Sequence, residues 1–248
     1  MGRPRRRGSL TYYRDDLALV HHLGFGFHAD ATAPGILALL EPVRGGIVLE
    51  LGCGTGLLSR HLVEAGHRVV ATDASPAMLA LARETVPGAD VRPLVLPDDP
   101  LPACDAVVSV GHVLSYLSDE AAVERALAAA ADALRPGGLL ALDLCDLRYG
   151  ELRRDEPNSS RIGDDWAIVT RFSLPRPNLL VREISTFLRS EDGTWRREDE
   201  RHENVLVDTS AVPALLAEHG VQARVADSFG DEELPDGLVA IVGRKADG

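Results

Sequence analysis

The sequence is poor in cysteine, aromatic residues and lysine. Its 248 residues include 3 cysteines, 4% aromatic residues and one lysine, Lys245. The cysteines Cys53, Cys104 and Cys145 are widely spaced, so they form no metal-binding pattern and cannot all pair. This usage is typical of reduced cysteines in a cytoplasmic protein, and it excludes the disulfide frameworks of small secreted proteins.

Basic charge and long apolar runs are also scarce. The chain has 38 acidic and 26 basic residues, a net charge of −12, which argues against nucleic acid as the main partner because a phosphate backbone requires a broad cationic surface. No segment approaches the roughly 20 apolar residues of a membrane-spanning helix. The arginine-rich start has no apolar stretch behind it, so it is not a secretory signal. We expect residues 1–11 to be disordered, with no nucleic-acid partner and no membrane segment.

The stretch from residue 46 to 73 predicts a strand, a glycine turn, a helix and a second strand. An apolar run at 47–51 is typical of a buried parallel strand. Helical spacing follows at 57–65, and a second apolar run at 69–72 ends in Asp73. The glycines of the turn are Gly52, Gly54 and Gly56.

This order of elements predicts a binding site for a ligand that contains a nucleoside. Glycines lack a Cβ atom, so a ligand can lie close to the backbone of the turn. Asp73 follows the second strand at the edge where an open α/β sheet binds ligands, and both its carboxylate oxygens can accept hydrogen bonds from a ribose diol. A nicotinamide-binding turn would require glycine at position 57, which is Leu57.

The turn instead resembles motif I of the class I S-adenosylmethionine (SAM)-dependent methyltransferases, as Glu50-Leu51-Gly52-Cys53-Gly54-Thr55-Gly56. Residues 73–83 resemble the second segment of that family. The resemblance implies an α/β fold with a Rossmann-like seven-stranded sheet, and it implies a methyltransferase that converts SAM to S-adenosylhomocysteine. The alternatives are an NAD(P)-dependent oxidoreductase and a non-catalytic SAM-binding protein.

The resemblance also implies where the cofactor binds. We expect its contacts at the carboxyl ends of the strands, with Met78 either against the adenine ring or packed in the core. No acid clearly follows the third strand, predicted at 91–96, so the partner of the adenine amino group stays open, with Asp98 and Asp99 as candidates. The candidate cofactor-binding residues are Glu50, Gly52, Cys53, Gly54, Gly56, Asp73, Ala74, Met78, Ser109 and Gly111.

The fourth strand, predicted at 105–110, leads to the catalytic candidates His112 and Tyr116. In the family this strand end faces the methyl group. An imidazole could take a proton from a hydroxyl acceptor, whereas a neutral amine needs mainly to be aligned. Alternatively, His112 caps the sheet or binds the SAM carboxylate. No metal is expected.

We expect four segments: an N-terminal arm with lid helices at 1–40, the SAM-binding core at 41–150, an antiparallel β insertion at 151–207, and completion of the core at 208–248. In the lid, a flexible aromatic stretch at 23–27 should precede a helix at 33–40 entered at Pro34. The insertion should contain strands at 166–174, 179–188 and 195–207. A helix is expected at 121–134. Strands at 139–144, 221–228 and 238–243 complete the expected sheet.

Such an insertion resembles the lids of small-molecule methyltransferases, including sugar N-methyltransferases. It implies a small-molecule methyl acceptor, with nitrogen and oxygen acceptors both open. In the alternative, the insertion mediates a homodimer or only stiffens the fold. The aromatic residues of the N-terminal segment then only pack this segment on the sheet. The substrate-contacting candidates are Tyr13, Phe25, Tyr149 and Trp166, with Arg171, Arg182, His202 and Glu203 as further candidates on the insertion.

Overall fold

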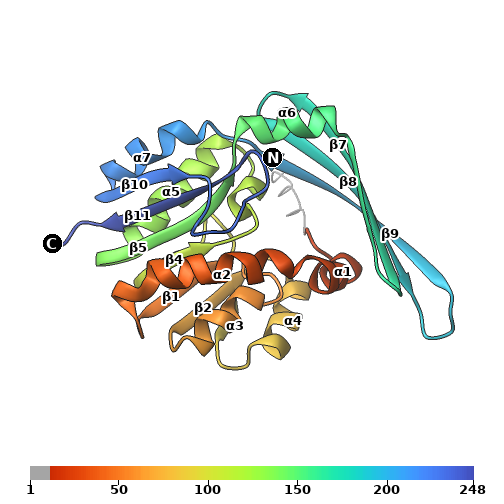
Figure 1. Ribbon diagram of the computed structural model, residues 1–248, viewed down its shortest axis with the longest axis horizontal. Coiled ribbons are helices and arrows are strands. Elements are labelled where there is room, and N and C mark those ends of the chain that lie inside the picture. The colour runs from red at the N-terminus through yellow and green to blue at the C-terminus, as the bar shows by residue number, and fades with distance from the viewer. Residues whose placement is uncertain (1–11) are drawn as a thin grey trace, which may run out of the picture.

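The computed structural model describes residues 12–248, so the expectation for residues 1–11 lies outside the described part of the chain (Figure 1). A seven-stranded sheet, ordered β10-β11-β5-β4-β1-β2-β3, forms the centre. The strand β11 is antiparallel to both neighbours, and the other pairs are parallel. This confirms the expected sheet. Its strands are β1 (Ile47–Leu51), β2 (Arg68–Asp73), β3 (Asp90–Pro93), β4 (Cys104–Ser109), β5 (Leu134–Cys145), β10 (Val221–Ala226) and β11 (Leu238–Lys245).

Helices cover both faces of this sheet, and β1 shows why. Successive residues of a strand point to opposite faces. Val48 belongs to a buried cluster with Ile36 of α2 (Phe27–Leu40) and Leu62 of α3 (Leu57–Glu64). Leu49 belongs to another cluster, with Leu127 of α5 (Glu120–Ala133). A strand that is apolar on both faces therefore requires helices on both sides. The core helices are α3 (Leu57–Glu64), α4 (Pro76–Thr85), α5 (Glu120–Ala133) and α7 (Val212–Glu218), with short 3₁₀ turns η1 (Glu41–Val43), η2 (Val113–Tyr116) and η3 (Thr209–Ala211).

The N-terminal segment differs from the expectation. It forms α1 (Asp15–Phe25) and α2 (Phe27–Leu40), so the predicted flexible stretch at 23–27 is wrong, and Pro34 lies inside α2 instead of starting it. Tertiary packing overrides the low helix propensity of glycine here. A Cβ atom on Gly24 would lie 2.4 Å from Trp166, and one on Gly26 would lie 2.9 Å from Leu57.

The segments Asp15–Phe25 and Phe27–Val43 meet at a bend of 62°. Among the described residues, no single helix is long and apolar enough to cross a membrane. This bent pair passes the same test by length and composition only.

The insertion is a four-stranded antiparallel sheet ordered β6-β7-β8-β9 that extends beyond the core as a long ribbon (Figure 1). The three expected strands are present as β7 (Trp166–Arg176), β8 (Leu179–Arg189) and β9 (Trp195–Val205). The sequence analysis missed α6 (Leu147–Asp155) and the edge strand β6 (Asn158–Ile162). Every residue of β6 is exposed, so this strand has no apolar alternation by which a sequence pattern could reveal it.

Two boundaries in the core also differ. The strand β5 begins at Leu134, ahead of the expected residue 139, because Cys104 of β4 pairs with Leu134 before a register shift. The strand β3 ends at Pro93 and is shorter than expected. Its pairing with β2 ends where Asp73 faces Pro93, so Asp73 lies at the carboxyl edge of the sheet as predicted.

We expect Gly24→Ala to destabilise the protein, although alanine usually favours a helix over glycine by about 0.5–1 kcal/mol. The new Cβ atom would meet the Trp166 ring, so α1 must shift from β7, which we expect to cost about 1–3 kcal/mol of unfolding free energy in urea denaturation. In a Trp166→Leu background the same substitution should be neutral or stabilising. Equal losses in the two backgrounds would contradict this explanation.

Candidate active site

The glycine turn between β1 and α3 depends on backbone angles that side chains disfavour. Gly52, Gly54 and Gly56 have φ angles of 67°, 53° and 82°, in the left-handed region that favours glycine. A Cβ atom on Gly52 would lie 2.3 Å from Val113. Beside Gly54 the space is open, with the Met78 sulfur 4.0 Å from the position of such an atom. The turn therefore offers an open backbone surface at Gly54.

Asp73 fixes this turn from the neighbouring strand. One carboxylate oxygen accepts the N–H of Gly54 at 2.9 Å, and the other accepts the N–H of Ser75 at 2.8 Å. Burial raises the pKa of the Asp73 carboxyl, and the N–H groups of Ser75 and Gly54 oppose that shift. The Ser75 hydroxyl caps α4 at the N–H of Met78 and donates to the Tyr13 carbonyl at 2.7 Å. One short segment thus connects the turn, α4 and the N-terminal segment at Tyr13.

Glu50 lies beneath the turn. It is buried, and Ser59 of α3 donates a hydrogen bond to its carboxyl group. Burial, reinforced by the negative charge of Asp73 and opposed by the Ser59 hydrogen bond, raises the pKa of Glu50 to about 8. Glu50 therefore holds a proton at neutral pH and connects β1 to α3 as a neutral group.

A cavity of about 260 Å³ opens above the turn. Six of the ten predicted cofactor residues line it. Ser109 lies below it, where its hydroxyl donates to the Leu51 carbonyl at 2.9 Å, and Glu50, Cys53 and Gly56 also lie outside the lining. The six are Gly52, Gly54, Asp73, Ala74, Met78 and Gly111.

The sequence analysis missed the apolar wall of this cavity. Leu94, Val95 and Leu96 follow β3, and Leu117 follows η2. Such a wall suits the flat face of an adenine ring. Neither Asp98 nor Asp99 lines the cavity, and Asp99 accepts the N–H of Val95 at 2.7 Å. Only the assembled fold reveals this wall, because its residues come from two loops.

A second cavity, of about 270 Å³, lies between the sheet edge, the N-terminal helices and the insertion. Tyr13, His21, Val110 and Gly111 line both cavities. The second also contains the predicted residues His112, Phe25 and Tyr149. Trp166 lines neither cavity, because its ring fills the space between Gly24 and Gly163.

His112 projects from a strained corner at the end of β4. Its φ and ψ angles are 50° and 41°, and Asp143 of β5 holds the corner by accepting the N–H groups of His112 at 2.7 Å and Gly111 at 2.8 Å. Burial lowers the pKa of His112 to about 3, and the positive charge of Arg182 adds to this shift. The imidazole is therefore uncharged near neutral pH and accepts protons weakly.

Tyr116 connects the core to the N-terminal segment and the insertion. Its hydroxyl lies 2.8 Å from the Tyr13 hydroxyl and accepts a hydrogen bond from Arg182 Nη1 at 2.7 Å. Burial raises the pKa of Tyr116 well above its usual value, so the phenol keeps its proton. The backbone N–H groups of Tyr13 and Arg14 donate to the Glu200 carboxylate of β9 at 2.9 and 2.8 Å. Glu200 thus holds the start of the N-terminal segment against the insertion.

The other candidates on the insertion divide between its two faces. Arg182 lines the second cavity, whereas Arg171 lies on the exposed face and pairs with Glu183. His202 is fully buried and lies 2.8 Å from the Glu200 carboxylate. Alternation along a strand predicts such a division, but it does not tell which face meets the core.

The first cavity fits SAM. A Cβ atom would occupy the open side of Gly54, where a ligand can approach the backbone. Asp73 and the apolar side chains of Leu94, Val95, Leu96 and Leu117 all line this cavity. The sheet order and this edge define a class I methyltransferase.

Comparison with known proteins agrees with this assignment. A family model described as a methyltransferase domain matches residues 48–138. An uncharacterized methyltransferase of Mycobacterium tuberculosis is 36% identical over 180 residues, which cover 70% of this chain and 71% of the relative. The chain therefore belongs to the SAM-dependent methyltransferases, and SAM is its cofactor.

Solved structures show the same fold. A sugar N-methyltransferase from a Streptoalloteichus species has a TM-score of 0.74 at 24% identity, over 97% of this chain and 98% of its own. A SAM-bound amino pentose methyltransferase from Micromonospora echinaspora has a TM-score of 0.71 at 20% identity, over 95% of this chain and 98% of its own.

We expect Asp73→Ala to weaken the binding of S-adenosylhomocysteine at least tenfold. The substitution removes the acceptor predicted for the ribose and releases the Gly54 N–H, and a hydrogen bond to a charged group contributes about 1.5–3 kcal/mol. Isothermal titration calorimetry would measure the change. Asp90→Ala, on the exposed end of β3, is the control and should bind normally; unchanged affinity in Asp73→Ala would contradict the assignment.

We expect Glu50→Gln to flatten the pH dependence of stability. With a pKa raised from 4.5 to about 8, folded wild-type protein retains a proton that the unfolded chain releases. The stability from this group is complete below pH 4.5 and is lost as pH rises through about 8. Wild type should therefore lose up to about 1.4 kcal/mol per pH unit relative to the variant across this window. Parallel stability curves from urea denaturation would contradict this.

Proposed function

We propose that this methyltransferase acts on a small molecule at an amine nitrogen within the second cavity. The observation that carries the proposal is the junction of the two cavities at Tyr13, His21, Val110 and Gly111. A molecule in the second cavity would meet the cofactor there, enclosed by the lid and the insertion. A cavity volume of about 270 Å³ suits a small acceptor.

The electrostatics of the second cavity favour an amine over a hydroxyl. Arg182 adds to the lowering of the pKa of His21 and of His112, each to about 3. The same positive field would lower the pKa of a bound amine, which leaves its lone pair free to attack. A hydroxyl would need a stronger base than His112 to remove its proton.

SAM, when bound, supplies a methyl group that its positive sulfur already activates. The protein's task is then to exclude water and align the acceptor nitrogen. Uncharged His112 can accept a hydrogen bond from the amine, and Tyr13 and Tyr116 place hydroxyl groups beside the junction. The N-terminal lid closes the site through the contact of its backbone with Glu200. The two similar structures whose names specify an amino sugar or a sugar nitrogen make amino sugars suitable first acceptors to test.

Methyl-labelled SAM would test this function. We expect the purified protein to transfer label from SAM to compounds in a small-molecule extract that pass a filter of about 3 kDa, and mass spectrometry should place the methyl group on nitrogen. Asp73→Ala should transfer far less label because it binds the cofactor poorly.

Label found only in protein or nucleic acid would contradict a small-molecule acceptor. Label on oxygen would contradict the amine assignment but preserve the small-molecule one. Normal cofactor binding with no transfer to extracts or to a panel of amines would favour the non-catalytic alternative.

A further inference from the structure

Three arginines line the second cavity without a carboxylate partner. They are Arg153 of α6, Arg161 of β6 and Arg182 of β8. Within residues 12–248, none of the three has a carboxylate oxygen within 4.0 Å. Two other arginines of the same insertion behave differently: Arg196 pairs with Asp16 of α1 at 2.6 Å, and the exposed Arg197 pairs with Asp199 at 2.8 Å.

Two of these guanidinium groups also have an unused donor. The Nε atoms of Arg153 and Arg182 are enclosed and have no hydrogen-bond partner in the described part of the protein. Arg182 uses Nη1 for the neutral hydroxyl of Tyr116. An enclosed cation with an unsatisfied donor is unfavourable unless an anion or another acceptor completes its surroundings.

The cavity provides no anion of its own for this purpose. Asp143 is the one carboxylate in the described lining, and its oxygens accept the N–H groups of Gly111 and His112. Burial raises the pKa of Asp143 to about 6. Its negative charge is therefore committed to the strained corner and leaves the arginines without compensation.

Arg153 and Arg182 converge on Phe172. The Arg153 guanidinium carbon lies 5.1 Å from the centre of the Phe172 ring and 5.0 Å from that of Tyr149. Phe172 is the register partner of Arg182 in the pairing of β7 with β8, so both side chains lie on the same face of the insertion sheet. Two cations with free Nε donors on neighbouring positions form a suitable binding site for an oxyanion.

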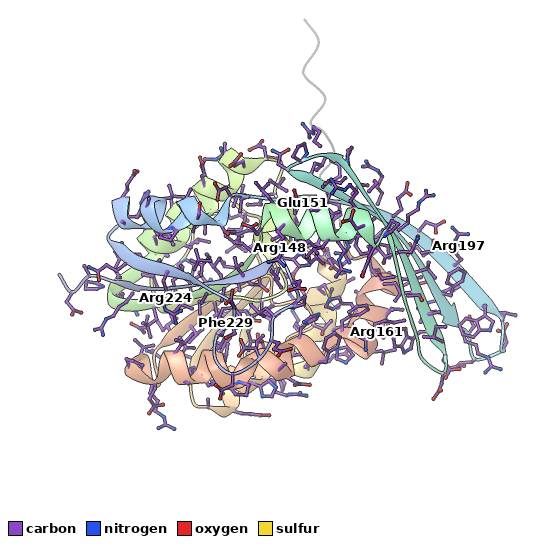
Figure 2. The ribbon with its side chains drawn as sticks, turned by 45° about the horizontal axis from the view of Figure 1, so that its top comes forward. Arg148, Glu151, Arg161, Arg197, Arg224 and Phe229 are labelled. Carbon is purple, nitrogen blue, oxygen red and sulfur yellow. The ribbon has the colours of Figure 1, made fainter. Side chains whose placement is uncertain are left out.

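Arg161 contributes from the rim. Its guanidinium carbon lies 4.5 Å from the Phe27 ring centre and 5.1 Å from that of Phe25. Figure 2 shows Arg161 between the N-terminal helices and the insertion. Arg148 lies elsewhere, at the start of α6. Arg161 thus adds positive charge where the lid meets the insertion.

We propose that the methyl acceptor carries an oxyanion, a carboxylate or a phosphate, which Arg153 and Arg182 bind beside Phe172. This inference rests on the proposed function because it names a second group on the same acceptor. The oxyanion anchors one end of the molecule under the insertion, and the amine reaches the junction at Gly111. The substrate class is therefore small amines that also carry a carboxylate or a phosphate. The distance between the two groups is no longer than the second cavity.

Binding of simple anions to the complex with S-adenosylhomocysteine tests the proposal. The probes are benzoate, phenyl phosphate and the neutral isostere benzamide, compared by calorimetry at constant ionic strength. We expect saturable binding of at least one anion, at least tenfold tighter than that of benzamide. Preference for benzoate identifies a carboxylate site, and preference for phenyl phosphate identifies a phosphate site.

Three variants define where the anion binds. Arg153→Gln should weaken anion binding at least tenfold, and Arg153→Lys should restore part of it because the charge is kept. Arg148→Gln, an exposed arginine on the same helix, makes the same change in charge and should bind as wild type does. Arg182→Gln should also lose anion binding, and its thermal unfolding and cofactor binding would show that the variant is folded.

Equal binding of benzoate and benzamide, or equal losses in Arg148→Gln and Arg153→Gln, would overturn the anion site. Failure of the anion site is distinct from failure of the proposed function. If labelled methyl groups reach neutral amines with the same KM in wild type and Arg153→Gln, the methyltransferase acts on a small amine and the inference about its anionic group is wrong.

Discussion

The hydrogen bond from the Gly54 N–H to the Asp73 carboxylate is the contact on which this site depends. It joins the ends of β1 and β2 at 2.9 Å and holds a glycine turn in left-handed backbone angles. The other Asp73 oxygen orients Ser75, which caps α4 and holds the N-terminal segment through the Tyr13 carbonyl. The half-buried carboxylate of Asp73 therefore connects the cofactor cavity to the N-terminal segment.

Charge divides the site into two halves. The cofactor half contains the carboxylate of Asp73, which is compatible with a ligand that carries a positive sulfur and an ammonium group. The second cavity contains Arg153, Arg161 and Arg182, and the field of Arg182 helps to keep the nearby imidazoles uncharged. The protein has a net charge of −12, so the positive charge of the second cavity is a local feature. It results from the insertion strands and α6.

Local patterns in the sequence predicted much of the fold. Apolar runs such as 47–51 and the glycine turn predicted the sheet and the cofactor edge, and six of ten cofactor candidates line the cavity. The prediction was wrong where tertiary packing overrides local preference: α1 continues through Gly24, and α2 begins directly after Gly26. The strand β6 was missed because all its residues are exposed, so its sequence has no alternation of apolar and polar residues. It is held by its pairing with β7.

The sequence by itself determined most of the succession of strands and helices, the glycine turn, Asp73 and the SAM-dependent family. These features depend on residues close together in the chain. Only the tertiary structure decided which side chains share a cavity. Arg153, Arg182 and His112 come from α6, the insertion and the end of β4, and Trp166 packs against α1 instead of lining the site. Proximity between residues so far apart in the chain arises from strand register and helix packing. The burial of these side chains and the unpaired charges of the second cavity arise in the same way.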